Sequence, residues 1–221
     1  YRNVNYALLG EVISQVSGTE YADDVQEHVL APLAMQAHFP TTPLGPLSAT
    51  GYMRRWDPIR MVLRLMVPDV ARRLYRNRLG ASVELHECVA SAPIGGLVGS
   101  VEDFSLFWQA QLRGGGGVIT RESTKLMQTL IFPGRPGIAC RDGMGLGWKF
   151  GTSRNGRFIN HEGGGPGFTS ELRLYPNLGV GIALAMNSMR MPHTMRTAHE
   201  ICESIVAGGS ESDDGSGTLS F

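Results

Sequence analysis

The chain has 221 residues, and 42% of them are hydrophobic, enough to bury the core of one large domain or of a domain with a subdomain. Its 20 basic side chains balance its 20 acidic ones. A chain without net charge has no overall field that favours nucleic acid or an anionic surface, so the composition argues against a nucleic-acid partner.

Two helices are predicted at the start of the chain. Apolar residues recur at helical spacing over residues 6–16, and Gly18 is placed to end this first helix. Thr19 can cap a second helix, and Pro32 closes it because proline cannot continue a helix. The first thirty residues therefore predict a helical pair.

A loop and then a basic segment follow. Residues 39–52 are rich in Pro, Thr, Gly and Ser, which predicts an irregular surface loop. The stretch from Pro58 to Leu79 mixes apolar residues with six arginines and is broken once by Pro68. Such an amphipathic stretch can pack on its own core, cover an active site as a lid, or contact a membrane surface. Packing is the commonest arrangement, and the other two remain open.

Two further helices are predicted in the middle of the chain. Ser100 and Asp103 form a capping-box pattern ahead of a helix that the glycines of residues 114–117 end. Thr120 can cap a shorter helix that runs through Leu130.

After Pro136 the pattern changes to short apolar segments separated by glycines, which predicts strands over residues 147–150, 157–160, 170–175 and 180–186. In the last of these, bulky residues alternate with Gly181, Ala183 and Ala185, so one face has room for a closely packed helix. The helix predicted over residues 192–206 is the candidate for that place.

This order of elements indicates an α/β (α+β) fold in which an antiparallel sheet is flanked by helices and joined to a helical subdomain. We expect one domain over residues 1–207, helical to residue 135 and formed by the sheet and a closing helix from residue 136. Residues 208–221 are predicted to be a disordered tail. Cys88, Cys140 and Cys202 lie far apart in the sequence, and we expect buried free thiols rather than a metal site or a disulfide.

Several common site motifs are absent from the sequence: a P-loop, a G-x-S-x-G elbow, H-E-x-x-H and G-x-G-x-x-G. Two candidate constellations remain. Tyr1-Arg2-Asn3 directly precedes the first helix, and a run from His161 to Phe168 rich in glycine lies between two predicted strands. Taken alone, the first can be a helix cap and the second a turn.

Their surroundings add a resemblance. Tyr1-Arg2-Asn3, together with the downstream Ala7-Leu8-Leu9-Gly10, resembles the Tyr-x-Asn segment of class C beta-lactamases, family VIII esterases and D,D-peptidases. The resemblance covers nearly the whole chain except the basic segment and the tail. It implies a partial beta-lactamase-like fold whose N-terminal strands are missing. Matching segments follow in the family's order at Pro93-Ile94-Gly95-Gly96-Leu97, Gly145-Leu146-Gly147-Trp148, His161-Glu162-Gly163, Pro166-Gly167-Phe168 and Asn187-Ser188.

The resemblance also implies a mechanism. In that family the serine of a Ser-x-x-Lys motif attacks an ester or amide and forms an acyl-enzyme that water hydrolyses. The chain's two lysines, Lys125 and Lys149, have Glu122 and Leu146 three residues before them, so this motif is absent. We therefore expect the nucleophile upstream of Tyr1, and we expect this chain by itself to be an inactive fragment.

Individual roles follow from the same resemblance, which implies no metal or cofactor. Tyr1 matches the tyrosine that hydrogen-bonds the nucleophile, and Asn3 matches the asparagine that orients the lysine and donates to the substrate. His161 and Gly163 match the Lys-Thr-Gly or His-x-Gly triplet on the strand beside the site. The N–H of Gly164 matches the second donor of the oxyanion hole.

Two functions, an acyl-transferring enzyme and a non-catalytic binding protein, are compatible with these residues. A histidine in the triplet is similar to esterase-like and peptidase-like members, which implies a small-molecule ester, a beta-lactam or a peptide as substrate. The alternative is a non-catalytic relative that binds peptidoglycan-like peptides or a protein partner. A Ser-x-x-Lys encoded in frame upstream would favour the enzyme. The sequence establishes neither the compartment, periplasmic, secreted or cytoplasmic, nor the oligomeric state.

Overall fold

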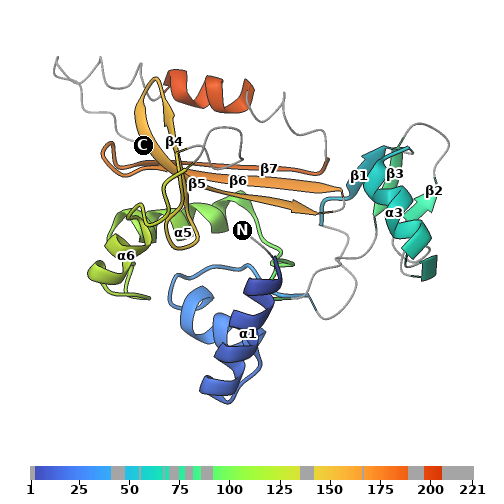
Figure 1. Cartoon of the computed structure of the whole chain (residues 1–221), viewed down its shortest axis with the longest axis horizontal. Helices are drawn as coiled ribbons and strands as arrows, with labels where there is room; N and C mark the ends of the chain where they lie inside the picture. Colours follow the sequence, from blue (N-terminus) through green and yellow to red (C-terminus); the bar gives the residue numbers. More distant parts are fainter. Residues whose placement is uncertain are drawn as a thin grey trace.

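The computed structural model describes residues 3–40, 48–54, 56–66, 68–69, 75–77, 82–85, 92–134, 142–165, 167–188 and 197–205. Figure 1 shows a twisted four-stranded sheet with helices on both of its faces, and a smaller sheet beyond one end of it. The N-terminal helices lie on the same side of the large sheet as α5.

The large sheet is an antiparallel meander of β4 (Lys149–Ser153), β5 (Gly156–Gly165), β6 (Phe168–Tyr175) and β7 (Val180–Met186). The four strands confirm the predicted ones, with longer bounds for the first three. The glycine run after His161 is part of β5, and its interpretation as a segment between two strands was wrong. Glycines 163 to 165 stay extended because each pairs with a residue of β6.

The N-terminal helix α1 (Asn3–Ser17) confirms the helix predicted from the spacing of the apolar residues. It ends where expected, at Gly18, whose φ of 73° is a left-handed conformation that glycine adopts without strain. Pro93 holds the helix in place, since a Cβ on Gly10 would lie 2.2 Å from the Cγ of Pro93. Two segments of the family resemblance are therefore in contact.

The start of the second helix differs from the predicted one. It begins as α2 (Tyr21–Val25) and continues as one π-helical turn, η1 (Gln26–Leu30), ending ahead of Pro32 as expected. The predicted cap by Thr19 was wrong: Glu20 occupies the N-cap position, and no side chain bonds the helix there. The hydroxyl of Thr19 instead lies 3.0 Å from that of Ser17, which draws it away from the helix start.

Helix α5 (Val101–Leu112) begins with the predicted capping box. The backbone N–H of Asp103 donates to Ser100 Oγ over 3.2 Å, and that of Ser100 donates to Asp103 Oδ2 over 2.9 Å. The other oxygen of Asp103 accepts from the backbone N–H of Gln36 at 2.6 Å. The cap therefore also joins α5 to the segment that follows η1.

Helix α6 (Arg121–Met127) follows the glycine run that ends α5, as the sequence predicted. Thr120 caps it by accepting from the N–H of Ser123 at 3.1 Å. The helix stops at Met127 rather than running through Leu130. The next segment leaves the helix because Phe132 pairs with Met144 in a short antiparallel bridge.

The two faces of the large sheet carry different helices. A Cβ on Gly181 would lie 2.5 Å from the indole of Trp108, so α5 packs on the small-residue face of β7. The expectation that residues 197–205 cover this face was therefore wrong. That helix lies on the opposite face (Figure 1), where Glu203 bonds Arg173 of β6. The α5 side holds the main core, around Trp148, Ile159 and Leu174, and a second cluster surrounds Leu30, Met35 and Ala37.

The smaller sheet was not predicted, and it lies within the region expected to be helical. Its three strands, in the order β1-β3-β2, are β1 (Gly51–Arg54), β2 (Tyr75–Asn77) and β3 (Ser82–Leu85). It adjoins the end of β7, because the N–H of Tyr52 donates to the carbonyl of Asn187 at 3.0 Å.

Between β1 and β2 lies helix α3 (Pro58–Met66), which forms the first half of the basic segment. Its described apolar side chains are exposed, so the expectation that this part packs on the core was wrong. No helix among the described residues is long and apolar enough to cross a bilayer. Cys202 is a half-buried free thiol, whereas Cys88, Cys140 and residues 208–221 lie outside the described residues.

Candidate functional site

The end of β5 forms an open strand edge. Strand β4 pairs with β5 only as far as Asn160, whereas β6 pairs with it to Gly165. Within the described part of the chain, residues 161–165 therefore have a strand partner on one side only. Among the described residues other than its chain neighbours, none has an atom within 4 Å of where a Cβ on Gly164 or Gly165 would stand. A ligand can approach this backbone closely and pair with its N–H and C=O groups.

His161 begins the open edge, and its ring orientation is fixed. Its Nδ1 lies 2.5 Å from the carbonyl oxygen of Gly147. Because a carbonyl only accepts, Nδ1 donates, and the neutral ring carries its lone pair on Nε2. In this tautomer Nε2 is the hydrogen-bond acceptor of the ring.

Gly147 supplies that carbonyl from a backbone conformation suited to glycine, with φ at 80°. Sequence patterns assigned no role to Gly147, although it lies in the Gly145-Leu146-Gly147-Trp148 segment that resembles the family. The positioning role depends on a contact across 14 residues of sequence, which the motif alone does not predict.

Glu162 points away from His161. Neighbouring side chains of a strand alternate between faces, and Glu162 lies on the face of Lys149, whose Nζ is 2.6 Å from Glu162 Oε2. The Glu162 side chain is 46% exposed, which makes this a surface ion pair. The charge of Glu162 is thus paired with Lys149 on the far face and lies away from His161.

Gly163 lies on the same face as His161 and opposite Ser170 of β6. A Cβ on Gly163 would lie 2.4 Å from Ser170 Oγ, so any side chain here would displace that hydroxyl. His161, Gly163 and Gly164 therefore lie along the same strand edge.

The other predicted residues belong to the helical part. Tyr1 lies outside the described residues. Asn3 is the exposed first residue of α1, and Figure 1 shows this end of the helix directed toward the large sheet. Asn3 thus lies within α1 rather than ahead of it, so the structure does not support the cap interpretation, and the residue is exposed.

A buried ionic cluster on the opposite face of the sheet was missed by the sequence analysis. His199 Nε2 lies 2.7 Å from Glu171 Oε2, and Arg173 bonds both Glu171 at 3.0 Å and Glu203 at 2.8 Å. Tyr175 donates to Glu203 Oε1 over 2.5 Å. These contacts join residues 197–205 to β6, so the cluster holds the last described helix on the sheet.

The cluster shifts the pKa values of its own members, among them Glu171 and Tyr175. Burial raises the pKa of Glu171, but the hydrogen bond from His199 and the charge of Arg173 outweigh it and leave this pKa below its usual value. Burial and the hydrogen bond to Glu203 raise the pKa of Tyr175. Glu171 is thus held as a carboxylate and Tyr175 as a neutral phenol.

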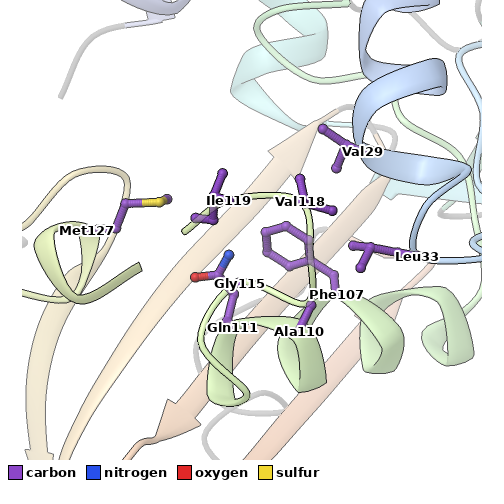
Figure 2. A pocket seen from close by; sticks show the side chains of 9 residues that line it. All are labelled: Val29, Leu33, Phe107, Ala110, Gln111, Gly115, Val118, Ile119 and Met127. Carbon is purple, nitrogen blue, oxygen red and sulfur yellow. The ribbon is translucent and has the colours of Figure 1, made fainter. Parts of the chain in front are cut away.

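A cavity of about 150 Å³ lies among η1, α5, α6 and the loop before α6 (Figure 2). Its walls are apolar apart from Gln111, whose Oε1 has no hydrogen-bond partner among the described residues. No residue of β5 lines it, and it holds no acid, base or nucleophile. The described residues also contain no group of three or more His, Cys, Asp or Glu that could hold a metal.

Comparison with known proteins identifies the family. The beta-lactamase family model matches residues 1–201, and the chain belongs to this family. It is similar to the D-alanyl-D-alanine-carboxypeptidase/endopeptidase AmpH of Escherichia coli, with 26% identity over 193 residues, 82% of this chain and 43% of AmpH.

Solved structures show the same fold. The D-amino acid amidase of Ochrobactrum anthropi in complex with L-phenylalanine matches with a TM-score of 0.72 and 20% identity, over 96% of this chain and 59% of the amidase. The octameric penicillin-binding protein homologue of Pyrococcus abyssi matches with a TM-score of 0.65 and 21% identity, over 87% of this chain and 39% of the homologue. The chain thus has a partial beta-lactamase-like α/β fold and spans less than half the length of AmpH.

Proposed function

We propose that this chain is the C-terminal part of a serine hydrolase that cleaves esters or amides through an acyl-enzyme, with esterase-like or D,D-peptidase-like activity. The open edge of β5, with an oriented His161 followed by three glycines, carries the proposal. Tyr1 and His161 are the proposed catalytic residues, and Asn3, Gly163 and Gly164 are the proposed substrate-binding residues.

The roles follow from what each group can donate or accept. The attacking serine, supplied from upstream of Tyr1, gives its proton toward Tyr1 as it bonds the substrate carbonyl carbon. The bond from that carbon to the alcohol or amine then breaks, and Tyr1 passes the proton to this leaving group. Water attacks the acyl-enzyme in the same way, and the serine regains its proton as the acid is released. A free tyrosine titrates near about 10, so Tyr1 accepts this proton only with a cation beside it, which the upstream lysine would supply. The negative charge that develops on the carbonyl oxygen is stabilised by the N–H of Gly164.

The shape of the edge favours an extended substrate. An unpaired strand edge binds an extended chain through alternating backbone hydrogen bonds, and side-chain-free glycines let that chain approach closely. A peptide or an acylated amino acid fits this description. The names of the relatives, a carboxypeptidase/endopeptidase and an amidase, support amide substrates.

The exposed face of α1 supports the presence of an upstream part. Of this helix only Gly10 is buried. Six large apolar side chains are exposed on it instead, an arrangement that a preceding segment would cover. These side chains are Val4, Leu8, Leu9, Val12, Ile13 and Val16.

The test compares the full-length gene product with this chain, using an activated p-nitrophenyl ester and a fluorescent penicillin that acylates the serine. We expect hydrolysis and labelling of the full-length protein and neither with this chain alone. In the full-length protein, His161→Ala should lower kcat/KM for the ester by about 100-fold or more, the usual effect of removing an acid–base group.

The matched control is His28→Ala, because His28 lies on η1, away from β5, with its side chain 64% exposed. This variant should keep the unmodified rate. Labelling of the isolated chain, or equal rates for the two histidine variants, would contradict the proposal. An upstream coding sequence without Ser-x-x-Lys would favour the non-catalytic alternative.

A further inference from the structure

We propose that α3 and the preceding Trp56 form a membrane-contact surface that lies on anionic lipid bilayers. This surface, called here the α3 face, consists of Trp56, Met61, Val62, Leu65 and Met66. All five side chains are exposed, and Leu65 is 81% exposed. Single exposed apolar residues are ordinary, but five within eleven residues form a patch that calls for a partner.

The helical arrangement of the α3 face suits an interface. At 100° per residue, Met61, Leu65, Val62 and Met66 occupy one side of the helix, and the exposed Arg64 falls on the other. A short helix with one apolar side and arginine on its polar side lies in the headgroup region rather than crossing the bilayer. The tryptophan beside it suits the same depth.

The charge of the sequence segment that contains the α3 face selects the kind of surface. Residues 54–78 contain eight arginines against two aspartates, a balance of +6 in a chain whose net charge is 0. The positive charge is therefore concentrated in this segment, although the whole molecule is neutral. Each basic residue near an anionic bilayer strengthens binding by about fivefold. Charge complementarity thus favours anionic lipid over a zwitterionic surface.

A second exposed apolar helix in the same chain sharpens the argument. Helix α1 also exposes large apolar side chains, but residues 3–17 contain no lysine or arginine. The α1 face suits a neutral apolar partner, such as another protein segment, and the α3 face suits anionic lipid. Helix α1 therefore serves as an internal control, because vesicle binding through exposed apolar side chains alone would involve α1 as well as α3.

The location of the α3 face gives the contact a consequence. The preceding strand β1 bonds the segment that follows β7, and Gly51 of β1 packs against Phe168, at the start of β6. Phe168 pairs with Gly165, the end of the open β5 edge. Membrane contact through α3 would hold this end of the strand edge beside the bilayer.

The experiment is co-sedimentation of the full chain with vesicles of phosphatidylglycerol and phosphatidylcholine, compared with pure phosphatidylcholine vesicles. We expect binding to the anionic vesicles at least about tenfold stronger than to the neutral ones, and loss of binding at high salt. Arg64→Gln should weaken anionic binding by about fivefold. Leu65→Asp should weaken it by more than about tenfold, because a carboxylate replaces an apolar group that enters the bilayer.

The matched control is Val16→Asp on α1, since Val16 is 83% exposed and equally free of packing. It should leave vesicle binding unchanged, with circular dichroism confirming that all three variants keep the same helical content. Equal losses for Leu65→Asp and Val16→Asp, equal binding to both vesicle types, or self-association through α3 in sedimentation without lipid would overturn the proposal.

Discussion

Replacing Glu171 by glutamine should destabilise the chain far more than the same change at Glu162. The two glutamates stand directly opposite each other on β5 and β6. Their side chains differ in burial: Glu171 is 7% exposed, with ionic partners at 2.7 and 3.0 Å, and Glu162 is 46% exposed, with one partner. Comparing the two glutamine variants therefore shows how burial changes the contribution of an ion pair to the free energy of unfolding.

The magnitude follows from what each change leaves behind. Breaking a buried pair costs about 3–5 kcal/mol, because a buried charge remains without its partner. Arg173 keeps its bond to Glu203, so part of the cluster remains paired and we expect about 2–3 kcal/mol for Glu171→Gln. The exposed pair of Glu162 should contribute less than about 1 kcal/mol.

Urea unfolding, followed by far-ultraviolet circular dichroism at pH 7, measures the difference. With a slope of about 2 kcal/mol per M, Glu171→Gln should lower the midpoint by about 1–1.5 M and Glu162→Gln by less than about 0.5 M. Equal midpoints for the two variants would refute the reasoning that the cluster holds residues 197–205 on the sheet.

The pH dependence gives an independent check. The pKa of Glu171 is lower in the folded chain than in the unfolded one, so its stabilising effect is present above the unfolded pKa of about 4.3. The effect is lost as the pH falls through the folded value. The stability difference between the natural chain and Glu171→Gln should therefore be full at pH 7 and shrink below about pH 4.

Three further substitutions test the packing, the cap and the site. Gly181→Ala should cost about 1–3 kcal/mol, because the new methyl group meets Trp108. Asp103→Ala should cost about 1–2 kcal/mol through loss of the capping box of α5, and this effect should fade in acid because N–H donors lower the pKa of Asp103 despite its burial. Gly147→Ala should cost about 1–2 kcal/mol for its left-handed backbone and change the nitrogen chemical shifts of His161 as the Nδ1 contact weakens.

The controls use glycines and histidines in other settings. Gly165→Ala should change the free energy of unfolding by less than about 0.5 kcal/mol, because the part of the chain that the structure describes, chain neighbours aside, leaves 4 Å of open space around the new methyl group. His28 serves as the reference for chemical shifts under Gly147→Ala. A cost for Gly165→Ala as large as that for Gly181→Ala would contradict the packing explanation.

Local signals predicted much of this fold correctly. Gly18 ends α1 because its left-handed conformation suits glycine, and Ser100 with Asp103 starts α5, since both effects act within a few residues. The family resemblance also implied a strand at His161 and Gly163, and both residues lie on β5.

Contacts between distant residues were not predictable in this way. The alternation in β7 correctly predicted a face with room for a helix, but α5 and residues 197–205 are both amphipathic, and the sequence pattern does not choose between them. The carbonyl of Gly147 that orients His161, and the glutamate pair that differs so widely in burial, likewise depend on three-dimensional neighbours.

By itself the sequence determined the family, the antiparallel meander, the main helix caps and the absence of a Ser-x-x-Lys motif, because each is written in short, ordered patterns. The tertiary structure alone decided that β5 extends past β4 to leave an open edge and that the α3 face points outward. Strand pairing and burial depend on which residues folding brings together. A sequence pattern shows only which residues are able to pair or to be buried.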